Sequence, residues 1–124
     1  MKKIYNHEKI NALGPYSHAN IAGNMVYLSG QLGINIETGE LAESIQEQTK
    51  YALENISLIL KGLDLTLENV VKTTVLLDNI GDFSDMNEVY ASFFPSNPPA
   101  RSCFEVSKLP AQAKVEIEAI AFIG

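Results

Sequence analysis

Lys114-Val115-Glu116-Ile117-Glu118-Ala119-Ile120-Ala121-Phe122-Ile123 is the stretch of sequence that decides the fold. Side chains of a strand alternate between two faces, so one face of this stretch is wholly apolar and consists of Val115, Ile117, Ala119, Ala121 and Ile123. The opposite face carries Glu116 and Glu118 together with Ile120 and Phe122. We therefore predict a long strand whose apolar face is covered by the rest of the chain.

A second extended segment precedes it, in Pro98-Pro99-Ala100-Arg101-Ser102-Cys103-Phe104-Glu105-Val106. Two prolines cannot continue a helix, so they force a turn and favour an extended conformation after it. Arg101, Cys103 and Glu105 then point to one face of this strand. If this strand pairs with or neighbours the Glu116 strand, a guanidinium and a carboxylate share a half-buried cleft. Such a cleft would suit a small anionic substrate and one acid–base step.

Two helices are predicted from apolar side chains at helical spacing. The first begins at Ser44, which forms a capping box with Glu47, and its apolar face contains Ile45, Thr49, Ala52, Ile56, Leu60 and Leu63. The second is capped by Asp82 and stopped by Pro95, and its apolar stripe contains Phe83, Met86, Val89, Tyr90, Phe93 and Phe94. Both helices therefore have one side to bury against a sheet.

The remaining strands complete an α+β layer. Residues 2–6, 16–21 and 25–29 are predicted as strands, the last two forming a hairpin around Gly23-Asn24, with Ser29-Gly30-Gln31-Leu32-Gly33 ending the hairpin. Val70 to Leu77 is predicted as a buried strand because it is β-branched and apolar with few interruptions. The order is strands, helix, strand, helix, strands, which predicts one domain over residues 1–124 with both helices on one side of a mixed sheet.

Composition limits the classes of partner. Nine basic and fifteen acidic residues give a net charge of −6 without any Lys/Arg run, so nucleic acid and anionic membranes are poor partners. One cysteine excludes an internal disulfide and fits a reducing compartment. We see no signal peptide or membrane-length apolar run, and expect a soluble, cytoplasmic protein. His7 and His18 have no Cys or His partner at metal-ligand spacing, so no metal site is predicted.

Several short blocks, taken together and in order, resemble the Rid (YjgF-type) reactive-intermediate deaminases. These are Gly14-Pro15-Tyr16-Ser17, Ser29-Gly30-Gln31, Val71-Lys72-Thr73-Thr74-Val75, Asp82-Phe83 with Met86-Asn87-Glu88-Val89-Tyr90, Pro99-Ala100-Arg101-Ser102-Cys103 and residues 115–121. The resemblance implies a chorismate-mutase-like homotrimer with a central barrel and ligand clefts between subunits. It also implies hydrolysis of 2-iminobutanoate and 2-iminopropanoate, released by pyridoxal-phosphate-dependent dehydratases, to 2-oxo acids and ammonia, with no cofactor of the deaminase's own.

The same resemblance assigns roles to individual residues. Arg101 would grip the substrate carboxylate and Glu116 would hold and polarise the attacking water. Cys103 would contribute mainly backbone groups, and the cleft would be lined by Tyr16, Ser29, Gly30 and Asn87. The family often has Gln-Ala-Val where this chain has His18-Ala19-Asn20, so His18 receives no role.

One arginine and one carboxylate suffice chemically, because a protonated imine already reacts with water and needs only positioning and proton transfer. Other interpretations of each residue stay open: a surface ion pair for Arg101, packing for Cys103 and Tyr16, a solvated helix position for Asn87, and a solvated strand face for Glu116 and Glu118. The alternative function is a non-catalytic regulatory protein that binds a small carboxylate. Ribonuclease activity is less favoured, because the sequence supplies no general-base histidine with a basic cradle.

Overall fold

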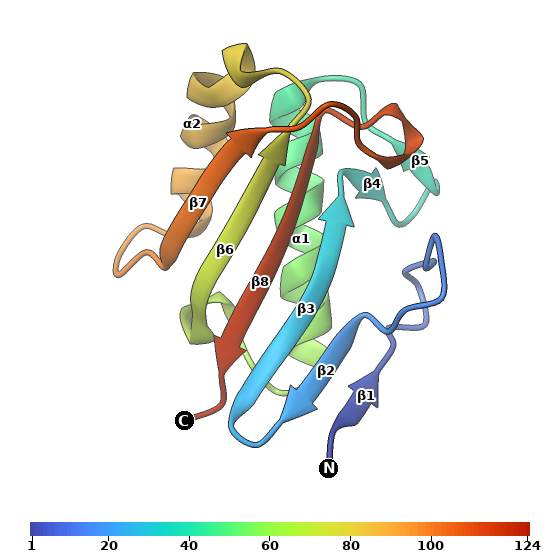
Figure 1. Ribbon diagram of the computed structural model, residues 1–124, viewed down its shortest axis with the longest axis vertical. Coiled ribbons are helices and arrows are strands. Elements are labelled where there is room, and N and C mark those ends of the chain that lie inside the picture. The colour runs from blue at the N-terminus through green and yellow to red at the C-terminus, as the bar shows by residue number, and fades with distance from the viewer.

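The computed structural model describes all 124 residues as a six-stranded sheet with two helices behind it (Figure 1). The sheet order is β1-β2-β3-β8-β6-β7, and the strands are β1 (Lys3–Tyr5), β2 (Ala19–Ala22), β3 (Met25–Leu32), β8 (Val115–Phe122), β6 (Val70–Leu77) and β7 (Ala100–Glu105). A separate hairpin joins β4 (Ile34–Asn35) to β5 (Glu40–Leu41), and the helices are α1 (Ile45–Gly62) and α2 (Phe83–Phe93). The predicted α+β fold with both helices on one face is confirmed.

Strand β8 lies in the middle of the sheet, antiparallel to β3 on one side and to β6 on the other. Its predicted apolar face is buried under the helices from Val115 to Ala121. The strand ends one residue earlier than predicted, and Ile123 beyond it is 44% exposed. The other face of β8, which carries Glu116, is not covered by either helix.

Helix α1 supplies the largest share of the core, and its side chains at Leu53, Ile56, Ile59 and Leu60 are almost fully buried. Full burial of each such side chain stabilises the fold by about 1.5–3 kcal/mol. The Ser44 side chain accepts the Glu47 N–H at 3.1 Å, as predicted. The reciprocal half of the capping box is absent, because the Glu47 carboxylate accepts the Ser44 hydroxyl instead.

Helix α2 covers the end of the sheet near β7, and its apolar stripe is only partly buried. Met86 and Tyr90 are buried, and so is Phe94 immediately after the helix. Phe83, predicted to be in the core, is 37% exposed at the first turn. Asp82 occupies the capping position, but its side chain makes no capping hydrogen bond, so that prediction was wrong. Neither helix is long and apolar enough to cross a membrane.

Three expectations about the strands need correction. The strand predicted over residues 16–21 is β2, which begins only at Ala19. The β3 strand continues through Gly30 to Leu32, with an irregularity in its pairing to β8 between Leu28 and Gln31, rather than ending at Ser29. Gly30 does not terminate the strand. Because it has no Cβ, the Glu116 side chain of β8 can instead approach its backbone closely. Strand β7 does not pair with β8, because β6 lies between them and runs parallel to β7.

Candidate active site

Arg101 and Glu116 lie on opposite faces of the sheet. Glu116 alternates with Val115 and Ile117, whose side chains are buried under the helices, so its own side chain points to the open face. Arg101 faces the other way, because its guanidinium contacts helix α2. The cleft that these two residues were predicted to share does not exist within one chain.

The Arg101 guanidinium is held by uncharged groups of α2. Its Nη1 donates to the Asn87 Oδ1 at 2.7 Å, and the guanidinium carbon lies 4.8 Å from the centroid of the Tyr90 ring and 5.6 Å from that of Phe83. The Tyr90 hydroxyl in turn hydrogen-bonds the Thr73 hydroxyl at 2.7 Å. Since none of these partners carries a negative charge, the positive charge of Arg101 is oriented but not neutralised. We call this arrangement the Arg101 clamp.

Cys103 lies on the same face of β7 as the clamp and packs against the core. Burial raises the pKa of its thiol, and the positive charge of Arg101 offsets only part of that effect. The sulfur is therefore protonated at neutral pH and is a poor nucleophile. This geometry agrees with a packing and backbone role for Cys103 rather than covalent catalysis.

Glu116 opens into a groove on the open face of the sheet, with a volume of about 420 Å³. The groove, here called the Glu116 groove, is lined by Leu13, Tyr16, Ser29, Gly30, Leu32, Pro110, Glu116 and Glu118. Burial, and then the neighbouring charge of Glu118, raise the pKa of Glu116 above its ordinary value. A carboxylate with a raised pKa is a better proton acceptor, which suits a general base acting on water.

One wall of the groove is a loop fastened to β3. The Ser29 hydroxyl donates to the Ser17 carbonyl at 2.6 Å, and the Ser29 N–H donates to the His18 carbonyl at 2.9 Å. The Tyr16 hydroxyl accepts the Leu13 N–H at 3.1 Å, while the side chain stays 43% exposed. These bonds fix the loop so that the Tyr16 ring faces the groove.

Gly30 and Gly33 make a matched pair for testing this groove. A Cβ at Gly30 would lie 2.8 Å from the Glu116 carboxyl carbon, whereas one at Gly33 would lie 2.6 Å from the Gln48 Cβ and even closer to the α1 backbone. We expect Gly30→Ala to displace the Glu116 side chain with little loss of stability, and to lower at least tenfold the rate of a reaction in which Glu116 takes a proton from water. Gly33→Ala is expected to lower the melting temperature by several degrees, since α1 itself must move. Equal effects of both variants on activity and melting would contradict this assignment.

The structure thus sorts the predicted site residues into two groups. Tyr16, Ser29 and Gly30 lie with Glu116 in the groove, and Asn87 and Cys103 lie with Arg101 on the other face. The sequence analysis missed Thr73, Phe83 and Tyr90 as supports of the Arg101 clamp. A signal for two of them was present, because Phe83, Asn87 and Tyr90 recur at spacings of four and three and so share one face of α2.

Comparison with known proteins identifies the family. The family model described as Endoribonuclease L-PSP matches residues 6–123. The chain belongs to this family, which is the Rid (YjgF-type) family. Membership covers nearly the whole chain, so the Arg101 clamp and the Glu116 groove both lie inside the matched region.

Named Rid relatives resemble the chain closely. It is 48% identical over 122 residues to Reactive Intermediate Deaminase A, chloroplastic, of Arabidopsis thaliana, covering 97% of this chain and 65% of that protein. It is 45% identical over 114 residues to the 2-iminobutanoate/2-iminopropanoate deaminase of Homo sapiens, covering 91% of this chain and 83% of that one. Among solved structures, E. coli TdcF with bound serine has a TM-score of 0.92 at 38% identity, covering 97% of this chain and 98% of that chain.

Proposed function

We propose that the protein is an imine deaminase that hydrolyses short 2-imino acids, such as 2-iminobutanoate and 2-iminopropanoate, to 2-oxo acids and ammonia. The observation that carries this proposal is the pairing of an oriented, unneutralised guanidinium with a separate carboxylate whose pKa is raised. Relatives at 48% and 45% identity that are named as deaminases support the same activity.

The substrate carboxylate binds to Arg101 through two parallel hydrogen bonds from the guanidinium. Asn87 occupies one side of Nη1, and the rings of Tyr90 and Phe83 restrict the plane of the guanidinium, so the remaining N–H groups point in a fixed direction. Fixing one end of a molecule of only a few carbons also fixes its imine carbon. Serine bound to the TdcF relative supports a site of this size for a small carboxylate.

Glu116 acts on water. The ionised carboxylate takes one proton from a water molecule while the water oxygen forms a bond to the imine carbon, and the C=N π electrons move to nitrogen. Starting from the protonated imine, this gives a neutral carbinolamine. The protonated Glu116 then returns its proton to the nitrogen, the C–N bond breaks and ammonia leaves, while the regenerated Glu116 carboxylate takes the hydroxyl proton as the carbonyl forms. Glu116 passes this last proton to the ammonia, which departs as ammonium. Each proton is accounted for by one carboxylate, so the chemistry requires no nucleophile on the protein.

Because Arg101 and Glu116 lie on opposite faces, they meet only if different subunits supply them. We propose a homotrimer in which the Arg101 clamp of one subunit lies beside the Glu116 groove of its neighbour. The open sheet face supports association, since Tyr27, Phe104 and Phe122 are each more than 40% exposed there and Ile120 lies among them. Burying these side chains would stabilise an interface.

The activity is tested with threonine dehydratase and threonine, which generate the imine in solution. With semicarbazide present to trap remaining imine, we expect this protein to increase the rate at which ammonia and 2-oxobutanoate appear and to decrease semicarbazone formation. If the rates are the same with and without the protein, the deaminase proposal fails.

The acidic side of the pH profile depends on Glu118. Activity falls at low pH as Glu116 becomes protonated, and the charge of Glu118 raises the pKa at which this happens. Glu118→Gln removes that charge, so the pKa of Glu116 drops and the acidic limb of kcat/KM moves to lower pH. Glu40→Gln on β5 changes the net charge equally and is expected to leave the limb in place. A shift to higher pH in Glu118→Gln would contradict the general-base role.

The same arrangement also supports a second candidate function, a non-catalytic protein that binds a small carboxylate, because the Arg101 clamp would retain its anion with or without chemistry. Cleavage of RNA has less support despite the family's descriptive name. His18 is only 2% exposed, and the groove holds Glu116 and Glu118, which repel a phosphodiester. A single half-buried thiol fits a reducing compartment, and we propose a cytoplasmic location.

A further inference from the structure

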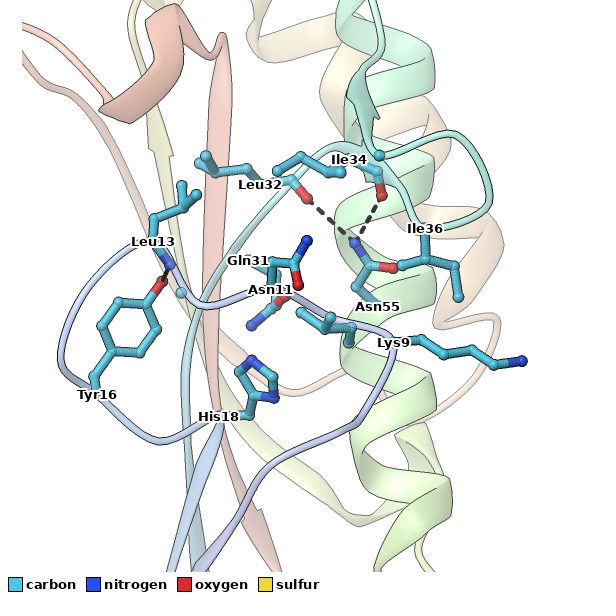
Figure 2. Close-up of a pocket in the computed structure, with 13 residues that line it drawn as sticks. Lys9, Asn11, Leu13, Tyr16, His18, Gln31, Leu32, Ile34, Ile36 and Asn55 are labelled. Atoms are coloured by element: carbon cyan, nitrogen blue, oxygen red, sulfur yellow. Dashed lines mark hydrogen bonds between the residues drawn. The ribbon is translucent and has the colours of Figure 1, made fainter.

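A second cavity shares one wall with the Glu116 groove and is drawn in Figure 2. Leu13, Tyr16, Gly30 and Leu32 line both spaces, but the second cavity extends beneath the loop toward α1 and β4. It has a volume of about 140 Å³, which exceeds what one or two water molecules occupy. We call it the His18 pocket.

His18 presents an unpaired donor in this pocket. The His18 Nδ1 accepts the His7 N–H at 2.8 Å, and burial lowers the pKa of the ring, so the imidazole is neutral and carries its proton on Nε2. The side chain is 2% exposed, and its Nε2 has no hydrogen-bond partner within the chain. In Figure 2 the ring points toward Asn11 and Gln31 across the pocket. A buried N–H without a partner is uncommon and gains from a ligand that accepts it.

The charge of the lining selects the ligand. Lys9 is the only charged side chain in the lining, and in Figure 2 its ammonium end extends away from His18. No aspartate or glutamate lines the pocket, although the protein carries a net charge of −6. The Glu116 groove has the opposite character, since Glu116 and Glu118 both face it. The lining of the His18 pocket therefore places no carboxylate against an anion, whereas the Glu116 groove places two against it.

The rest of the lining limits the size and polarity of that anion. Ile10, Leu32, Ile34 and Ile36 provide apolar walls around the donor at His18. A group with two acceptor oxygens at one end and a short hydrocarbon at the other would satisfy both the His18 donor and these walls. A bulky ligand would not fit the volume of the pocket, and a polyanionic ligand would have more charged groups than the single buried donor can satisfy.

We propose that the His18 pocket is a binding site for a short aliphatic monocarboxylate, separate from the Arg101 clamp, with the His18 Nε2–H donating to the carboxylate and Lys9 at its rim. This proposal concerns binding within one chain and does not depend on the deaminase activity.

Propionate is the probe, and Arg101→Ala is the background, because that change removes the competing anion site. In protein labelled with ¹⁵N at histidine, we expect propionate to shift the His18 Nε2 signal saturably while 1-propanol, of equal length and no charge, does not. Lys9→Glu is expected to weaken propionate binding about three- to tenfold, and Lys2→Glu, an equal charge change outside the pocket lining, is expected to have little effect.

His18→Leu removes the donor and is expected to abolish the saturable response, which in uniformly ¹⁵N-labelled protein is followed through the amide signals of Gln31 and Asn55. Since this variant also removes the acceptor for the His7 N–H, its melting curve is recorded first. If His18→Leu does not fold, the comparison of Lys9→Glu with Lys2→Glu decides whether propionate binds in the His18 pocket. No saturable shift with propionate, an equal response to 1-propanol, or equal weakening by both lysine variants would overturn the proposal.

Discussion

Glu116→Gln is expected to lower the rate of imine hydrolysis about a hundred- to ten-thousand-fold, the range over which a positioned general base usually contributes. Glutamine keeps the size and hydrogen-bonding shape of the side chain but does not accept a proton from water. The KM is expected to change little, because the substrate carboxylate binds to Arg101 on a different face of the sheet. The measurement is the semicarbazide-trapping assay across a range of substrate supply rates.

A binding measurement accompanies this assay and separates the two candidate functions. Glu116→Gln is expected to bind 2-oxobutanoate as the unmodified protein does, and Arg101→Ala is expected to bind it at least tenfold more weakly, owing to loss of a charge-assisted bidentate contact. Unchanged turnover in Glu116→Gln would refute the general-base role. Arg101-dependent binding without turnover in the unmodified protein would instead establish the non-catalytic alternative.

Mixing two inactive variants is expected to restore activity. Arg101→Ala subunits retain Glu116, and Glu116→Gln subunits retain Arg101, so an interface that takes one residue from each contains an intact pair. With random exchange in a cyclic oligomer, about a quarter of the interfaces have this composition, and activity is expected to return to about a quarter of normal. The variants are combined by coexpression, or by unfolding and refolding together, and assayed at equal total protein.

The control mixes Arg101→Ala with a chain that carries both substitutions, a combination in which no interface regains Arg101. Activity is expected to stay at the level of the parents in that mixture. A site contained within one chain would give no restoration in either mixture. Sedimentation of the unmodified protein as a monomer at micromolar concentration would also contradict a shared site, because the Arg101 clamp and Glu116 groove would then never meet.

The sequence predicts the elements of this fold better than their spatial order. The strand at Val70–Leu77 and the helix after Ser44 are long and strongly periodic, and both were confirmed. The β4–β5 hairpin has strands of two residues, which is too short for any alternation to appear, and it was missed. Gly30 looked like a strand terminator because a glycine can end a strand or admit a close neighbour, and only the position of Glu116 distinguishes the two.

For the site, too, the sequence predicts local features better than their arrangement in space. Alternation correctly places Arg101 and Cys103 on one face of β7, and Glu116 and Glu118 on one face of β8. Alternation does not show whether these two faces lie on the same side of the sheet. That depends on β6 lying between the two strands and on the side from which α2 packs. The aromatic support of Arg101 was assigned to the core because Tyr90 fits an apolar stripe as well as it fits a cation partner.

The only sulfhydryl of the chain belongs to Cys103, a few side chains from the group proposed to receive an electrophilic substrate. Free imines are hazardous in a cell because they combine with exposed nucleophiles on other proteins. With its proton retained by burial, this sulfur does not compete with water for the substrate. Burial of this sulfur therefore slows its addition to the imine carbon during turnover.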